Sequence, residues 1–270
     1  MSNQVMDVEV IEQFYESAQE LYFERIEAEL ADVAPKLKAR RGFMSDDTRI
    51  SDLQGKDVPI VVGQSLMVFD QKLTAEERQI AADSQTFAET LVKRLPAHTS
   101  VAECYKVYND ALLSCGWYSE SFTLQEYVTQ KLTITMNEAV LQILETVVGA
   151  GSGNILNMVV SGIKDLKGDA KSMKVVETGS KKNRTVSFKA VPCYASPDGG
   201  VTMAMGALDL VDAKFDGNFL VVSIQTEGVK MFRSAGARKL NKRLFERKKE
   251  RIYDYIDSFT DDLLVSTVNK

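Results

Sequence analysis

The chain has 270 residues, of which 44% are hydrophobic and 26% charged, and its formal net charge is −5 at pH 7. This composition is typical of a soluble globular protein, and the negative charge argues against a general nucleic-acid binder. The three cysteines, Cys104, Cys115 and Cys193, have no close pairing that would indicate a disulfide framework. Residues 1–14 lack the basic and apolar regions of a Sec-type signal. We therefore expect synthesis in the cytoplasm, with release or membrane association by another route.

The first part of the chain is predicted to be rich in helices. Residues 8–34 repeat apolar side chains at helical spacing, and a proline follows directly. Thr74 with Glu77 and Ser100 with Glu103 have the spacing of capping boxes, in which side chains satisfy the free N–H groups of the first helical turn. Helices should therefore begin at both positions. The β-rich segments of this part lie over residues 58–69 and 122–136.

The segment Glu138 to Lys167 differs from the rest of the chain because its centre, residues 146–163, carries no charge over 18 residues. Gly149, Gly151 and Gly153 interrupt this centre. We predict a helical hairpin buried in the core. Gly149 and Gly153 would allow the bend and a close approach of the two backbones.

A second interpretation of the same segment is contact with a membrane. As one helix, its 18 uncharged residues would span about 27 Å at ~1.5 Å each, short of a hydrocarbon core of about 30 Å. The glycines, asparagines and serines also offset the apolar side chains. A stable single span is therefore not expected, whereas shallow insertion stays open. The membrane contacts would be Val147, Val148, Ile155, Leu156, Val159 and Val160.

The glycines also raise a third interpretation, dinucleotide binding. A Rossmann turn needs glycines where a strand leads into a helix, so that the pyrophosphate can approach the backbone. Here Asn154 stands where the third glycine is required, and no series of alternating strands and helices follows. We therefore rank this interpretation well below the hairpin.

The second part of the chain changes to β-strands from Arg184 onward. Val186, Phe188 and Ala190 alternate with other residues and should share one face of a strand. Two further strands should follow, over residues 201–215 and 218–232, and a closing helix over residues 240–259. The polar segment before the strands, residues 167–183, should be an exposed connection. We predict an α+β fold, with a helix-rich part over residues 1–166 and an antiparallel meander plus basic helix over residues 167–270. The two parts can share one core.

The segment Arg238 to Arg251 contains eight basic and two acidic residues, which is a local charge of +6 in an acidic protein. Basic side chains on an amphipathic helix can bind an anionic membrane surface, at about 1 kcal/mol per residue. The alternative is a solvated surface that the acidic N-terminal helix neutralises. The candidate membrane contacts are Arg238, Lys239, Lys242, Arg243, Arg247, Lys248, Lys249 and Arg251.

Catalytic and metal-binding motifs are weak in this sequence. His98 is the single histidine, and no nucleophile elbow, C-x-x-C or H-E-x-x-H pattern accompanies it. We predict no metal, no cofactor and no catalytic residue. Cys193 is set apart by Pro192 before it and by a Pro-Asp-Gly-Gly turn after it. A buried structural cysteine and a reactive or acylated thiol are both open, because reactivity needs exposure and thiolate character.

The segment FKAVPCYASPDGG, which contains Cys193, and the overall architecture resemble the Erwinia virulence factor (Evf) family of bacterial proteins. The resemblance implies an elaborate α/β topology, membrane association and a fatty acyl group on a cysteine. Carried over to this chain, that cysteine is Cys193. One acyl chain gives only marginal membrane binding, so the basic helix would supply a second signal.

Three classes of function follow from these features. The first is a membrane-interacting virulence factor or toxin-like protein, with an anionic membrane as its partner. The second is an interaction or assembly protein, in which the apolar segment belongs to the core or to a homo-oligomer interface. The third is a cysteine-dependent acyl-transfer enzyme, although the sequence favours a non-enzyme. We expect the first class.

Overall fold

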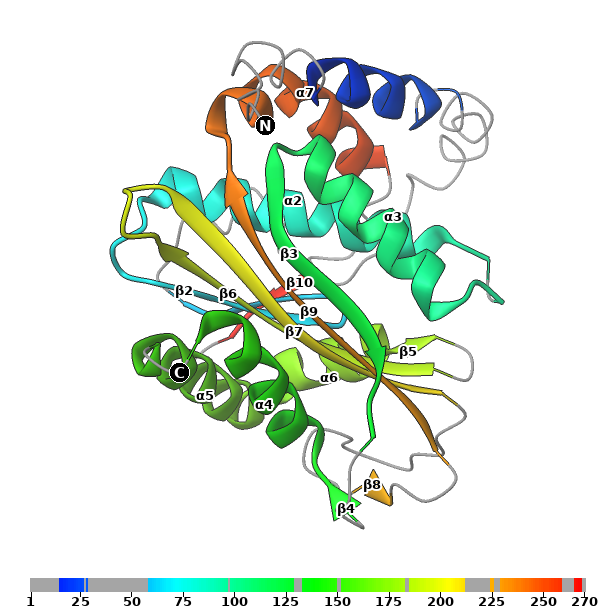
Figure 1. The fold of residues 1–270 in the computed structure, drawn as a ribbon, viewed down its shortest axis with the longest axis vertical. Coiled ribbons are helices and arrows are strands. Elements are labelled where there is room, and N and C mark those ends of the chain that lie inside the picture. Colours follow the sequence, from blue (N-terminus) through cyan, green and yellow to red (C-terminus); the bar gives the residue numbers. More distant parts are fainter. Residues whose placement is uncertain are drawn as a thin grey trace, which may run out of the picture.

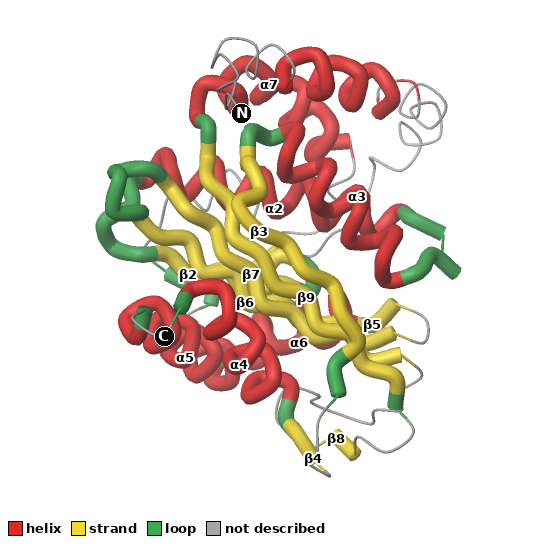
Figure 2. Tube along the Cα trace, viewed as in Figure 1, coloured by secondary structure: helices red, strands yellow, loops and turns green. Residues whose placement is uncertain are grey.

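The computed structural model describes residues 15–26, 28, 58–96, 98–128, 133–149, 152–182, 185–211, 224–225, 229–258 and 265–268. A twisted β-sheet lies between two layers of helices (Figures 1 and 2). The strands of this sheet are β1 (Ile60–Val62), β2 (Ser65–Phe69), β3 (Trp117–Glu126), β5 (Lys181–Lys182), β6 (Thr185–Ala195), β7 (Val201–Val211), β9 (Lys230–Leu240) and β10 (Val265–Thr267). A separate small pair joins β4 (Thr133–Ile134) to β8 (Ile224–Gln225).

The strand order of the large sheet is β10-β1-β2-β6-β7-β9-β3, and β5 pairs with β6 outside this path. All neighbours are antiparallel except β2 and β6, which are parallel. The sheet is therefore mixed, and the α+β class predicted from the sequence is confirmed. Strands from both sides of residue 166 are interleaved, so the two predicted parts of the chain contribute to one sheet.

Each face of the sheet packs against its own helical layer. One layer consists of the helix over residues 15–26, α2 (Ala75–Arg94), α3 (Val101–Ser114) and α7 (Lys242–Ser258). The other consists of α4 (Met136–Val148), α5 (Gly153–Gly168) and α6 (Ala170–Ser180). Along β6, Val191 and Cys193 belong to the core beneath α2 and α3, whereas Phe188 and Ala190 belong to the core beneath α4 and α5. Alternate side chains therefore fill two cores.

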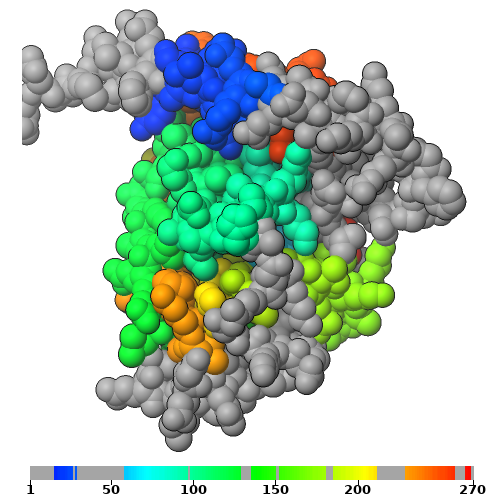
Figure 3. Space-filling model, turned by 90° about the vertical axis from the view of Figure 1, so that its right-hand side faces the viewer, coloured from blue at the N-terminus to red at the C-terminus, as the bar shows by residue number. Residues whose placement is uncertain are grey.

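Among the described helices, three begin with capping boxes. Those at Thr74 and Ser100, predicted from the sequence, are confirmed, and Thr135 forms a third with Glu138. On the side of the molecule drawn in Figure 3, the N-terminal helix (blue) lies beside α3 (blue-green). Gln19 Nε2 of this helix donates to Ser114 O of α3 at 2.9 Å. Of the predicted helix over residues 8–34, residues 8–14, 27 and 29–34 lie outside the described residues.

Several predicted boundaries are wrong. Residues 170–180 form α6 instead of an exposed connection, because Met173, Val175 and Val176 are buried against the sheet. β3 starts at Trp117, and Met136 already belongs to α4. The third strand was predicted over residues 218–232, but its described residues divide between β8 and β9, and β9 extends to Leu240; residues 218–223 and 226–228 lie outside the described part. The closing helix begins only at Lys242.

Glycines position the α4–α5 hairpin on the sheet. Gly149 has φ +81° after the end of α4, so the predicted bend is confirmed. The predicted close approach at Gly149 and Gly153 is wrong, because a Cβ at either position would meet nothing within 4 Å. The close approaches occur instead at Gly162 of α5, where a Cβ would lie 2.4 Å from Val68 Cγ1, and at Gly206 of β7, where it would lie 2.8 Å from Leu144 Cβ.

Candidate functional site

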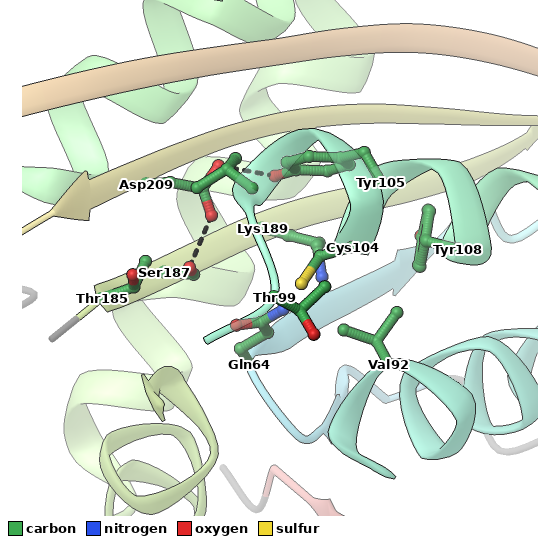
Figure 4. A pocket seen from close by; sticks show the side chains of 11 residues that line it. Gln64, Val92, Thr99, Cys104, Tyr105, Tyr108, Thr185, Ser187, Lys189 and Asp209 are labelled. Carbon is green, nitrogen blue, oxygen red and sulfur yellow. Dashed lines mark hydrogen bonds between the residues drawn. The ribbon is translucent and has the colours of Figure 1, made fainter. Parts of the chain in front are cut away.

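A small cavity that several polar side chains line lies between α3 and the sheet (Figure 4). α3 contributes Tyr105 and Tyr108, β6 contributes Ser187 and Lys189, and β7 contributes Asp209. Ser187 and Lys189 alternate with the apolar residues of β6 and so point to the opposite face from Phe188. This cluster was not predicted from the sequence, because the polar residues of that strand form no recognisable motif.

Asp209 is held by two hydroxyl groups. Its Oδ1 accepts from Ser187 Oγ at 2.5 Å, and its Oδ2 accepts from Tyr105 OH at 2.9 Å. The carboxyl group is only 4% exposed, and burial raises its pKa despite these two hydrogen bonds. Burial likewise raises the pKa of the Tyr105 hydroxyl.

Lys189, in contrast, pairs with a side chain of α2. Its Nζ lies 2.7 Å from Glu89 Oε1, and the same oxygen accepts from Ser65 Oγ at 2.6 Å and from Gln85 Nε2 at 3.1 Å. The Lys189 ammonium also lies 4.8 Å from the centre of the Tyr108 ring, within cation–π range. The network therefore connects α2, α3 and the sheet.

The cavity measures about 50 Å³. This volume is far below the range of about 300–1,000 Å³ that is typical of small-molecule sites, so an organic substrate does not fit in it. In the part of the chain that the structure describes, no three histidine, cysteine, aspartate or glutamate side chains gather as a metal site requires. The cluster fastens the helical layer to the sheet through these hydrogen bonds and the Lys189–Glu89 pair.

Cys193 lies in β6 with no exposed surface, in the core beneath α2 and α3. Burial raises the pKa of its thiol, which disfavours the thiolate. An acyl donor or a substrate cannot reach this sulfur while the core is closed. The acylation of Cys193 stays a prediction, and it requires the two layers to separate or the modification to precede folding.

The apolar residues predicted to contact a membrane divide by position on the α4–α5 hairpin. Val159 is fully buried and belongs to the core. Val147, Val148, Ile155 and Leu156 are half-buried around the tip. Val160 is 48% exposed on the outer side of α5.

Because the glycine-containing turn joins two helices rather than a strand and a helix, the dinucleotide interpretation is wrong.

The basic segment is divided between two elements. Arg238 and Lys239 belong to β9, not to the helix. Arg238 is 1% exposed and donates to Asn109 Oδ1, whereas Lys239 pairs with Asp198 at 2.8 Å and with Glu120 at 3.2 Å. Burial of Arg238 inside the fold excludes it from a surface patch.

Acidic residues pair with most of the remaining basic side chains, which lie on α7. Arg247 pairs with Glu16, and both Lys248 and Arg251 pair with Glu20. The other two pairs are Lys242 with Glu76 at 2.6 Å and Lys249 with Glu246 at 3.4 Å. Arg243 is exposed. The interpretation in which the acidic N-terminal helix neutralises this surface therefore fits the geometry.

No family model matches this chain, and no curated protein sequence matches it either. Solved structures with a similar fold include the Evf virulence factor, at 11% identity over 84% of this chain and 90% of that chain, with a TM-score of 0.34. They also include the activated Cyt2Ba monomer from Bacillus thuringiensis subsp. israelensis (12% identity, 66% and 97% coverage, TM-score 0.39) and a delta-endotoxin (9%, 66% and 83%, 0.37). The family that the sequence resembles is thus among the structural matches.

Proposed function

We propose that this chain is a membrane-interacting protein of the virulence-factor or toxin type, and that it touches the bilayer with the tip of the α4–α5 hairpin. The observation that carries the proposal is the surface of the hairpin. Between Glu145 and Lys164 the sequence contains no ionisable side chain. Around this tip Val147, Val148 and Leu156 are only half-buried.

The expected mode is shallow and reversible. If five half-buried or exposed aliphatic side chains each gain ~1 kcal/mol on entering the interface, the tip contributes roughly 5 kcal/mol. That free energy corresponds to a dissociation constant on the order of 0.2 mM. No helix among the described residues has both the length and the apolar character needed to cross a bilayer. Surface insertion is therefore the mode to test.

Electrostatic attraction by α7 has a minor part in this proposal. Glu16, Glu20 and Glu76 already pair with basic side chains of that helix. An anionic membrane would have to replace these partners. We therefore expect binding to neutral and anionic vesicles alike, with little effect of salt.

Co-sedimentation with neutral and anionic vesicles at low and high salt tests the proposal. Val160→Glu and Val148→Glu place a charge on the hairpin, and each should weaken binding by about tenfold or more. Leu21→Glu is the matched control, because Leu21 is 68% exposed on the N-terminal helix, away from the hairpin. It should bind as the wild type does. Absence of binding, or unchanged binding of Val160→Glu, would overturn the proposal.

Two further outcomes separate the alternatives. Binding only to anionic vesicles that is lost at high salt would move the contact from the hairpin to basic side chains. Self-association that depends on concentration, ignores lipid and is abolished by Val160→Glu would favour an assembly protein instead. Release of an entrapped dye from the vesicles tests the toxin-like part separately, and intact vesicles at saturating protein would contradict that part.

A further inference from the structure

A groove of about 510 Å³ lies along α5, and this size falls within the range of small-molecule sites, about 300–1,000 Å³. One wall is a stripe of α5 that carries Asn154, Asn157, Ser161 and Asp165. These positions recur at helical spacing and so face the same side of the helix. The opposite wall is the end of β2 and the turn after it, and Tyr194 of β6 also lines the groove.

The polar groups of this groove have unused hydrogen-bonding capacity. The side chains of Asn154, Asn157, Ser161, Asp165 and Tyr194 make no hydrogen bond to another residue in the described part of the chain. The two amides and the two hydroxyls can both donate and accept, whereas the carboxylate only accepts. A ligand that matches this set must itself carry several groups that donate and accept.

The rest of the lining limits the charge and shape of the ligand. Asp70 and Asp165 contribute two negative charges and Lys72 one positive charge, which leaves a net charge of −1 and disfavours anions. Met158 and Val68 contribute apolar surface between the polar groups. The ligand therefore has hydroxyl-like groups on its rim and an apolar face, and it carries no negative charge.

We propose that this groove binds a neutral saccharide. Ring hydroxyls would donate to the Asp165 carboxylate and exchange hydrogen bonds with the Asn154 and Asn157 amides. The C–H face of the ring would lie against Tyr194 and Met158. Gly162 sets the depth of the groove, because its missing side chain lets α5 lie directly on Val68 of β2. This groove adjoins the proposed membrane contact, because Ile155 belongs to both, whereas Val160 does not line the groove.

Saturation-transfer NMR on the full chain tests the proposal, with glucose, galactose, mannose, N-acetylglucosamine, N-acetylgalactosamine and sialic acid as probes. At least one neutral sugar should receive saturation, and sialic acid should receive less because its carboxylate meets Asp70 and Asp165. Asp165→Asn and Asn157→Ala should each weaken binding of that sugar by about tenfold. Lys167→Ala is the control, because Lys167 is exposed on α5 but does not line the groove. An unchanged melting temperature shows that each variant is folded.

No saturation from any neutral sugar would overturn the proposal, as would equal signals for wild type, Asp165→Asn and Asn157→Ala. A second arm separates two sources of the sugar, using the Val160→Glu variant so that the hairpin contact is weakened. If vesicles doped with galactosylceramide sediment this variant, and free galactose releases it from them, the ligand is a glycolipid headgroup. Binding of free sugar without such sedimentation identifies a soluble or protein-borne glycan. Failure of this test leaves the membrane proposal untouched, because that proposal uses undoped vesicles.

Discussion

The ammonium nitrogen of Lys189 on β6 lies 2.7 Å from Glu89 Oε1 on α2, and the two side chains are only 2% and 4% exposed. The residues are 100 positions apart in the chain. Ser65 of β2 and Gln85 of α2 donate to the same carboxylate oxygen. A buried ion pair with such additional hydrogen bonds is costly to break from one side, because the partner left behind is an uncompensated charge. This pair therefore fixes where α2 lies on the sheet.

Double-mutant analysis should show this coupling directly. Glu89→Leu leaves a buried ammonium and Lys189→Leu leaves a buried carboxylate, so each should lower the free energy of unfolding by about 3–5 kcal/mol. The double variant removes both charges and should lose less than the sum of the two. Urea denaturation of the four proteins measures the difference. Strictly additive losses would contradict the coupling between Lys189 and Glu89.

Helices and strands were easier to predict from the sequence than the packing of the helices on the sheet. The capping boxes at Thr74 and Ser100 were readable because they are local signals. The alternation of Val186, Phe188 and Ala190 also correctly gave one face of β6. The other face was left without a role, because a Ser and a Lys in a strand normally indicate solvent. Only the long-range packing of α2 and α3 buries Ser187 and Lys189, and no local pattern encodes it.

The same limit explains the errors in the second part of the chain. Residues 170–180 are polar by composition, and the few apolar side chains that anchor α6 do not stand out against that background. Arg238 lies in a run of basic residues, which suggests a solvated helix. Its place in β9 became clear only from the register, in which Arg238 lies opposite Met203 and Ser119. The groove along α5 likewise arises from elements that are distant in sequence.

The packing of α5 on β2 predicts a strong effect of one methyl group. In Gly162→Ala the new Cβ would lie 2.4 Å from Val68 Cγ1, and the stiff β-branched valine cannot turn away. We expect a loss of about 1–3 kcal/mol in unfolding free energy. Gly168→Ala, at the end of the same helix, has open space and should be neutral or slightly stabilising. Combining Gly162→Ala with Val68→Ala should recover part of the loss, and failure to do so would refute the contact as its cause.

Asp83 gives the protein a defined dependence of stability on pH. Burial on α2 raises its pKa to about 6, against the hydrogen bonds from Gln79 and Tyr253. In the unfolded chain the pKa of an aspartate is about 3.9, so between about pH 3.9 and about pH 6 the folded protein keeps Asp83 protonated while the unfolded chain has lost that proton. The contribution of Asp83 to stability is therefore complete below about pH 4 and is lost as pH rises through about 6. Above that pH, the buried carboxylate costs roughly 2–3 kcal/mol relative to its protonated form.

Asp83→Asn removes this titration. The variant should be more stable than the wild type at pH 8, and the difference should shrink toward pH 4. Thermal unfolding followed across this pH range measures it. Asp254→Asn on the exposed side of α7 is the control and should leave the pH profile unchanged. A wild-type profile that rises with pH between 4 and 7, and that Asp83→Asn does not alter, would contradict the assignment.

The three cysteines should differ sharply in reactivity. Cys104 is half-buried, whereas Cys115 and Cys193 are fully buried with thiol pKa values raised by burial. In the native protein, a thiol reagent followed by peptide mapping should label Cys104 first. Cys193 should react only in denaturant or on vesicles that open the core. Rapid native labelling of Cys193 would instead make it accessible to an acyl donor, and Cys193→Ala identifies its share of the signal.

Two variants of the N-terminal helix separate the contribution of apolar burial to stability from the contribution of surface ion pairs. Phe23 is 1% exposed and its ring stacks 5.8 Å from Phe87, so Phe23→Ala should cost about 3–5 kcal/mol at any salt concentration. Glu20, with a half-exposed side chain, pairs with Lys248 and Arg251, which lower its pKa. Glu20→Gln should cost less than about 1 kcal/mol, and high salt should abolish this loss. Urea denaturation at low and high salt measures both variants. If Glu20→Gln cost as much as Phe23→Ala, the ion pairs with α7 would hold this helix as strongly as the aromatic contact with Phe87 of α2.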